Sequence, residues 1–287
     1  MRILSIFGTR PEAVKMAPVV KALQSNPAIE SIVCVTAQHR EMLDQVLNLF
    51  QIIPDIDLNL MQHDQTLAGL TAAVFQNLDP VLDNLQPDWV LVQGDTTTVM
   101  AASLLGYYHK IHVGHVEAGL RTKDKWQPFP EEINRRIAGV IADLHFAPTE
   151  WSRQNLLAEG IPDKKITVTG NPVIDALMNI AKRPIPVETT ELLRNMGVDV
   201  DTRAPMSRSK GSRLVILTAH RRENFGLPLE NICRAILALA DHYGSDDQYV
   251  KPVHHNPNVQ EPVYRLMGAV ENITLLPPKD YLPPVYY

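Results

Sequence analysis

The stretch RILSIFGTRPEAVKMAP, residues 2–18, sets the fold. Its first six residues form a short, mostly apolar run that predicts a β-strand, and a Gly-Thr-Arg turn then leads into a helical pattern with proline in its first turn. The same order of apolar run and helical pattern recurs along the chain. The predicted strands are residues 2–7, 31–36, 88–93, 111–115, 144–147, 214–218, 248–253 and 273–276. Such alternation is typical of an α/β fold with a parallel, doubly wound sheet.

Two domains are predicted, residues 1–170 and 171–287. The run at 214–218 restarts the alternation after a polar, basic stretch, residues 201–213, that is typical of an exposed connection. The second domain is the smaller one, and we expect it to be incomplete. Ligands of doubly wound sheets bind at the carboxyl ends of the strands, so a site is expected in the loops that follow the strands.

Composition excludes several classes of protein. The 287 residues contain 27 Lys and Arg against 32 Asp and Glu, and the resulting charge of −5 is spread along the chain. A nucleic-acid or anionic-membrane partner needs a clustered basic face, which this sequence lacks. No apolar run approaches the roughly 18 residues of a membrane span, and the apolar N-terminal run is too short for a signal peptide. Cys34 and Cys233 have no metal or redox spacing, so we expect a reduced, cytoplasmic protein without disulfides.

The loop after the first strand is a candidate anion site. Residues 8–12 (GTRPE) lie between a strand and a helix start, where backbone N–H groups attract anions, and Arg10 and Lys15 add charge suited to a diphosphate. The loop matches neither a P-loop nor GxGxxG, so neither Mg–ATP nor NAD follows. A plain turn with a solvated arginine is the alternative.

Three carboxylates follow later strands or open a helix. Asp95 lies in GDTTT, Glu117 in HVEAGLR and Glu131 in PFPEEINR. Helix capping by Asp95 and a helix-dipole role for Glu131 are the structural alternatives. If the three converge on one cleft, they suit acid–base chemistry and stabilisation of an oxocarbenium-like transition state.

The predicted second domain offers phosphate-binding side chains. His220, Arg221 and Glu223 lie in TAHRREN after its first strand, and His254 follows the next strand. Donation to a phosphate is the functional interpretation, and ordinary surface residues are the alternative. Adjacent histidines point apart on an extended chain, so His254 and His255 are not expected to form a metal pair.

Together these segments resemble the non-hydrolysing UDP-N-acetylglucosamine 2-epimerases of bacteria. The matching strings, in chain order, are FGTRPEAVKMAP (7–18), VTAQHREMLDQV (35–46), GDTTT (94–98), VGHVEAGLRT (113–122), PFPEEINR (128–135), TGNPVIDAL (169–177), TAHRREN (218–224) and PVHHNPNV (252–259). They extend over essentially the whole chain. The resemblance implies two Rossmann-like domains in the GT-B arrangement, a homodimer, and no metal or nicotinamide cofactor.

The family resemblance also implies a reaction. UDP-GlcNAc and UDP-ManNAc would interconvert, for surface polysaccharides, by anti elimination of UDP to 2-acetamidoglucal and re-addition after a proton returns to the opposite face of C2. The residues that match the family's catalytic positions are Asp95, Glu117, Glu131 and His220. Those that match nucleotide-sugar positions are Arg10, Lys15, Asp95, Glu117, His220, Lys279 and Pro284. Those that resemble a second, activating site are Gln38, Glu41, Arg221, Glu223 and His254.

The chain departs from the family at several of these positions. Glu41 and Asp64 replace glutamine and arginine of some relatives, which argues against allosteric activation, and Lys279 and Pro284 replace the family's Gln and Phe. The sequence given also stops before a Ser-Gly-Gly and Gln-Glu-Glu segment that binds UDP in the family. Two alternatives to the epimerase therefore remain: a hydrolysing relative that releases ManNAc and UDP, and an inactive, truncated nucleotide-sugar-binding remnant.

Overall fold

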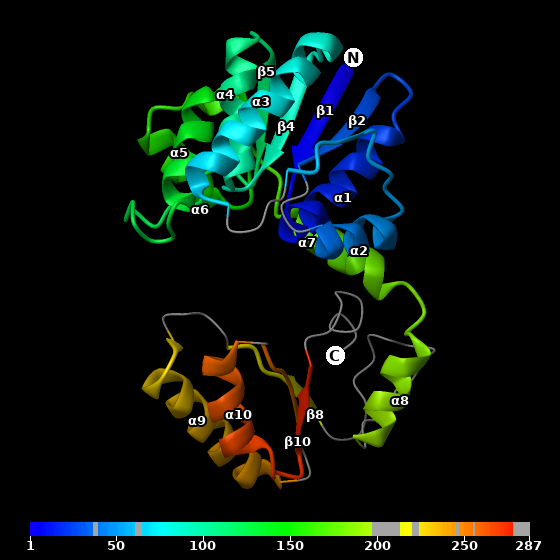
Figure 1. Cartoon of the computed structure of the whole chain (residues 1–287), viewed down its shortest axis with the longest axis vertical. Helices are drawn as coiled ribbons and strands as arrows, with labels where there is room; N and C mark the ends of the chain where they lie inside the picture. Colours follow the sequence, from blue (N-terminus) through cyan, green and yellow to red (C-terminus); the bar gives the residue numbers. More distant parts are fainter. Residues whose placement is uncertain are drawn as a thin grey trace. The chain divides into compact units, whose positions relative to one another are not determined.

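A computed structural model describes residues 1–36, 40–60, 65–196, 213–219, 224–244, 247–254 and 256–277. The chain folds into two compact units, one up to Ala176 and one from Leu177 onward (Figure 1). The two units are taken one at a time below. Among the described residues, no helix combines the length and the apolar character that crossing a membrane requires.

A parallel sheet of seven strands in the order β3-β2-β1-β4-β5-β6-β7 forms the centre of the first unit. The strands are β1 (Arg2–Phe7), β2 (Glu30–Val35), β3 (Ile56–Asp57), β4 (Trp89–Gln93), β5 (His112–Val116), β6 (Leu144–Ala147) and β7 (Ile166–Val168). The helices are α1 (Arg10–Gln24), α2 (Arg40–Phe50), α3 (Leu67–Leu85), α4 (Thr97–Tyr108), α5 (Glu131–Ile141) and α6 (Glu150–Ala158), with one 3₁₀ turn at Asp163–Lys165. Helix α7 (Pro172–Ala181) begins in this unit and continues past the boundary at residue 176. The chain order reverses between β1 and β4, and ligands of doubly wound folds bind at such a switch point.

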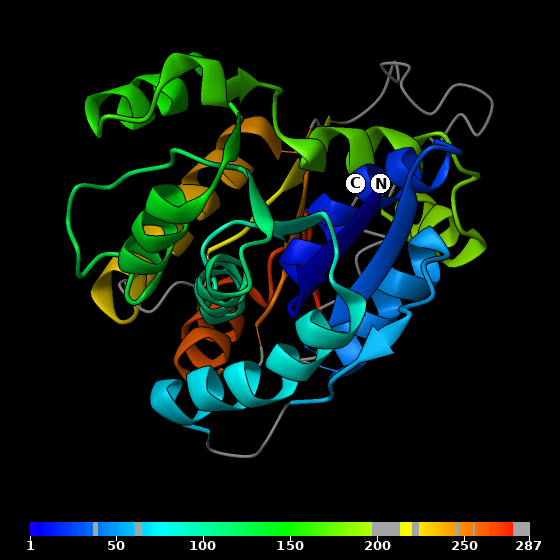
Figure 2. The same cartoon turned by 90° about the horizontal axis from the view of Figure 1, so that it is seen from above.

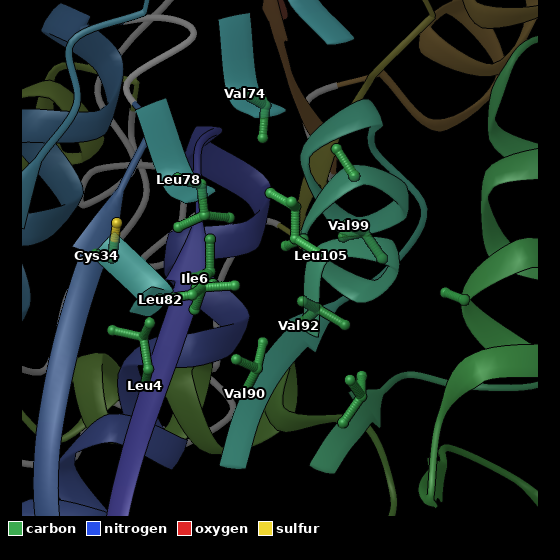
Figure 3. Close-up of a cluster of buried hydrophobic side chains, with 14 of the residues drawn as sticks. Leu4, Ile6, Cys34, Val74, Leu78, Leu82, Val90, Val92, Val99 and Leu105 are labelled. Carbon is green, nitrogen blue, oxygen red and sulfur yellow. The ribbon is translucent and has the colours of Figure 1, made fainter. Parts of the chain in front are cut away.

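Both faces of this sheet are covered, which explains its nearly continuous apolar strands. Leu4 and Ile6 of β1 are fully buried in a cluster with side chains of α3, α4 and α5 (Figure 3). The alternate side chains Ile3 and Phe7 are also buried, and α1 contacts β1 as well. Because successive side chains of a strand point to opposite faces, α1 covers the second face. Figure 1 shows α3, α4 and α5 on one side of the strands and α1 and α2 on the other, and Figure 2 gives the view from above.

The second unit contains a smaller parallel sheet in the order β10-β9-β8. Its elements are α8 (Val187–Asn195), β8 (Arg213–Ile216), α9 (Leu227–Tyr243), β9 (Asp247–Pro252), α10 (Pro257–Met267) and β10 (Ile273–Leu276). Leu229 and Cys233 of α9 pack with Val259 and Met267 of α10 against Tyr249 of β9. This unit therefore has an apolar core of its own.

The predicted α/β class with parallel sheets is confirmed. All eight predicted strands are present, with ends displaced by at most two residues. The two shortest strands, β3 and β7, were not predicted. The predicted connection at 201–213 lies outside the described residues except for Arg213, which begins β8. The two compact units meet at 176/177, six residues after the predicted boundary.

Candidate functional site

A cavity of about 300 Å³ opens at the carboxyl ends of β1, β4 and β5. Its charged lining residues are Glu12, Lys15, Asp95, Glu117 and Glu131. Lys15, Asp95, Glu117 and Glu131 were predicted as site residues from four separate motifs, and the fold brings them into one cavity. Arg10, the first residue of α1, is not among the described residues that line it.

Glu117 is held by more hydrogen bonds than the other two predicted catalytic carboxylates. Its backbone takes the left-handed conformation, with φ of 64°, directly after β5. Lys15 Nζ donates to Oε1 at 2.8 Å and to Oε2 at 2.6 Å. Asn171 Nδ2 donates to Oε1 at 2.8 Å, and Gln93 Nε2 donates to Oε2. The side chain is only 8% exposed, so these donors replace the water that a free carboxylate would bind.

The loop that carries Glu117 depends on Gly119. This residue has a φ of 88°, and a Cβ atom there would lie 2.3 Å from the Ser152 carbonyl oxygen at the start of α6. Asn155 of α6 also donates to the Gly119 carbonyl, at 2.9 Å. The predicted tight bend at this glycine is therefore confirmed, and it allows the loop to pack closely against α6.

Asp95 forms an ion pair instead of capping a helix. Its carboxylate accepts from Arg135 Nη2, and its backbone carbonyl accepts from Asn134 Nδ2 at 3.0 Å. The N-cap of α4 is Thr96, whose hydroxyl accepts from the Val99 amide at 3.3 Å. The capping interpretation of Asp95 is therefore wrong, because the next residue takes that place and leaves the aspartate to face the cavity.

The two glutamates that open α5 have different surroundings. Glu132 is fully buried and accepts from the backbone amides of Thr122 and Lys123 and from Arg135 Nη1 at 3.3 Å. Glu131 lines the cavity, and among the described residues its buried Oε2 has no hydrogen-bond partner. Glu132 thus stabilises the loop before α5, whereas Glu131 retains the capacity to accept a proton or a hydrogen bond.

Two backbone amides of the loop GTRPE donate hydrogen bonds to a side chain of the same loop. Glu12 Oε2 accepts from the backbone amides of Gly8 at 3.1 Å and Thr9 at 2.7 Å, and Oε1 accepts from the Thr96 hydroxyl at 2.8 Å. Burial nevertheless raises the pKa of the Glu12 carboxyl, against the opposing effect of these hydrogen bonds. The sequence predicted that backbone amides of this loop bind a ligand anion. For Gly8 and Thr9 this prediction is wrong, since their amides already bind the Glu12 carboxylate.

Two buried histidines lie next to each other in β5 and β6. His115 of β5 and His145 of β6 are register partners, and burial lowers the pKa of each to about 4. His115 Nε2 lies 2.7 Å from the Gly94 carbonyl oxygen and must therefore carry the proton of this hydrogen bond. The bond holds the turn that leads into Asp95.

Most of the other predicted site residues are not described by the structure. His220, Arg221, Glu223, Gln38, Lys279 and Pro284 lie outside the described residues. Glu41 is part of α2, and its side chain is outside the description. His254 is exposed in the second unit after β9, where its Nδ1 accepts from the Asn256 amide at 3.1 Å. Their predicted roles stay predictions.

Three polar residues at the site were not singled out from sequence. Gln93 is the last residue of β4, Asn171 precedes α7, and Arg135 lies in α5. Each lies inside or beside one of the quoted motifs. A single amide side chain, or an arginine within a helix, has no characteristic spacing from which a site role could be predicted. Across the part of the chain that the structure describes, no cluster of three or more His, Cys, Asp or Glu side chains is arranged to hold a metal ion.

Comparisons with known proteins agree on one family. A family model described as UDP-N-acetylglucosamine 2-epimerase matches residues 21–286. The UDP-N-acetylglucosamine 2-epimerase of Salmonella typhimurium is 52% identical over 286 residues, which is all of this chain and 74% of that protein. The corresponding Escherichia coli K12 protein is 50% identical over 289 residues, again with 100% and 74% covered.

Solved structures give the same result. The Neisseria meningitidis UDP-GlcNAc 2-epimerase bound to UDP-GlcNAc has a TM-score of 0.84 and 49% identity, with 100% of this chain and 75% of that chain covered. A Staphylococcus aureus protein solved with UDP has a TM-score of 0.82 and 43% identity, with 98% and 70% covered. The predicted resemblance and the predicted Rossmann-like fold class are both confirmed.

Proposed function

Since the chain belongs to the UDP-N-acetylglucosamine 2-epimerase family, we propose that it epimerises UDP-GlcNAc at C2 to give UDP-ManNAc, without hydrolysis. The observation that carries this proposal is the single cavity into which Asp95, Glu117 and Glu131 converge with Lys15. Relatives solved with UDP-GlcNAc and with UDP support the choice of substrate. The chemistry that such a cavity offers is proton transfer beside a positive charge.

Elimination of UDP makes C2 acidic enough for a carboxylate base. The C2 hydrogen is not next to a carbonyl group, so its direct removal would be costly. Cleavage of the C1–O bond sends an electron pair to the diphosphate, and the developing cation at C1 acidifies the C2 hydrogen. Loss of that proton to a carboxylate leaves a C1=C2 double bond. Return of a proton to the opposite face and attack of UDP oxygen on C1 complete the epimerisation.

We assign removal of the C2 proton to Glu131. Its Oε2 has no partner among the described residues, whereas both oxygens of Glu117 are occupied by donors and Asp95 is paired with Arg135. Asp95 and Glu117 would then stabilise the positive charge that develops at C1, as preorganised negative groups do. The returning proton needs a different donor, because one carboxylate reaches only one face of the sugar.

Lys15 is proposed to bind the diphosphate without releasing Glu117. Its ammonium group has three N–H donors, and contacts to Glu117 account for two. The side chain is 23% exposed, so the remaining donor can reach a ligand in the cavity. Arg10, His220, Lys279 and Pro284 stay predicted substrate contacts from the family resemblance.

Replacement of Glu131 tests this assignment. Glu131→Gln keeps the shape of the side chain but cannot accept the C2 proton, so we expect kcat to fall by about 100-fold or more in a UDP-ManNAc formation assay. Asp83→Asn removes an exposed carboxylate on α3 and is expected to match the wild type. Full activity of Glu131→Gln would contradict the assignment.

The products separate the alternatives. Free ManNAc with UDP would indicate a hydrolysing epimerase, and folded protein that neither converts nor binds UDP-GlcNAc would indicate an inactive remnant. A homodimer, a cytoplasmic location and a role in bacterial surface polysaccharide synthesis are proposed from the family resemblance alone. The activating site at Gln38, Glu41, Arg221, Glu223 and His254 likewise stays a prediction.

A further inference from the structure

The Glu117 carboxylate has little room for another partner. A carboxylate offers about four lone-pair sites, and Lys15, Gln93 and Asn171 supply four donor contacts, two on each oxygen. These donors come from α1, from the end of β4 and from the residue before α7. Three separate parts of the first unit therefore fix one side chain.

Asn171 is the donor that lies furthest from Glu117 in sequence. Its Nδ2 donates to Glu117 Oε1 at 2.8 Å, and its Oδ1 accepts from the Val173 amide at 3.1 Å. The second contact fixes the orientation of the amide group, because Oδ1 is committed to the turn that opens α7 and the NH₂ group must point toward Glu117. One side chain thus joins the start of α7 to a carboxylate of the cavity.

We propose that Asn171 is a positioning residue for Glu117, with Gln93 acting on the second oxygen. The inference rests on the proposed function, in which Glu117 stabilises positive charge at C1. Lys15 alone would allow the carboxylate to rotate about a single cation, whereas amide donors from two directions fix its plane. A displacement of about 1 Å at a reacting centre can cost about 100-fold in rate, so such restraint bears on the chemical step.

Asn171→Asp separates positioning from a capping role. Aspartate keeps the oxygen that accepts from Val173 and is as good a helix cap as asparagine, so a merely structural role predicts wild-type behaviour. At Glu117, however, the change replaces a donor at 2.8 Å by a like charge. We expect kcat to fall by about 100-fold, with KM changed by less than about 3-fold.

Two further variants complete the comparison. Asn171→Ala removes donor and cap together and is expected to lower both kcat and the Tm. Asn77→Asp makes the same chemical change on the exposed surface of α3 and is expected to match the wild type. An Asn171→Asp variant with wild-type kcat would overturn the proposal.

A second readout does not depend on turnover. The carboxyl ¹³C signal of Glu117, assigned with Glu117→Gln, is expected to shift in Asn171→Ala at fixed pH and to stay in place in Asn77→Asp. An unmoved signal would overturn the contact itself. A signal that shifts in a protein without epimerase activity would contradict both the proposed function and the positioning role. It would still support the hydrogen bond between Asn171 and Glu117.

Discussion

Arg135 links the two kinds of acidic residue at the site. Its guanidinium donates to Asp95, which lines the cavity, and to Glu132, which is fully buried. Burying a carboxylate is costly unless a cation and hydrogen-bond donors compensate for the lost water. The same arginine thereby stabilises the loop before α5 and holds the Asp95 side chain through an ion pair.

Loss of this arginine is expected to be severe. Arg135→Met leaves Glu132 and Asp95 without their shared cation, so we expect the free energy of unfolding to fall by about 3–5 kcal/mol and activity to be lost. Arg153 is a matched control, because it pairs with the exposed carboxylates Glu150 and Asp163. Arg153→Met is expected to leave the free energy of unfolding nearly unchanged, because exposed ion pairs contribute little to stability. Urea denaturation measures both, and equal losses would contradict this account.

Sequence alone identified four of the five charged residues of the cavity but not their environment. Lys15, Asp95 and Glu117 were predictable because each follows a strand in a parallel fold, where the loops converge. Glu131 was selected from its place at a helix start. Gln93 and Asn171 could not be found in this way, since their roles arise from contacts over 24 and 54 residues.

At the scale of elements, Glu12 couples the starts of two helices. It accepts from the amides that precede α1 and from the hydroxyl of Thr96, the N-cap of α4. The side chain is only 2% exposed. These contacts hold the loops after β1 and β4 together at one side of the cavity.

Stability is expected to depend on pH through Glu12. Burial raises its pKa above 4.5 in the folded protein, so the folded state holds this proton more tightly than the unfolded state. The contribution of Glu12 to the free energy of unfolding is therefore fully present below pH 4.5. It is lost as the pH rises through the pKa of the folded state, at up to about 1.4 kcal/mol per pH unit. Glu12→Gln lacks this titration. The difference in unfolding free energy, wild type minus Glu12→Gln, should therefore decrease above pH 4.5, and an increase would contradict the assignment.

The elements themselves were largely predictable because their signals are local. The first strand and α1 follow from an apolar run, a turn and a proline in the first helical turn. Strands β3 and β7, with two and three residues, are too short to show a period and form through pairing with β2 and β6. These two strands form only by pairing with neighbours that are distant in sequence, so a local sequence pattern could not predict them.

At the scale of the molecule, the described lining of the charged cavity comes from the first unit. Its lining residues lie between Thr9 and Glu131, before the boundary at residue 176. The second unit has its own sheet and core, and its predicted phosphate-binding residues in TAHRREN lie outside the described residues. The proposed proton chemistry therefore rests on residues of the first unit.

Proton NMR of UDP-GlcNAc incubated with this chain in D₂O tests the central claim most directly. Proton removal and return at C2 in D₂O predicts UDP-ManNAc that carries deuterium at C2, with no accumulation of free ManNAc. An unchanged spectrum from folded protein, or UDP-ManNAc that retains its C2 proton in full, would contradict proton transfer by the carboxylates of this cavity.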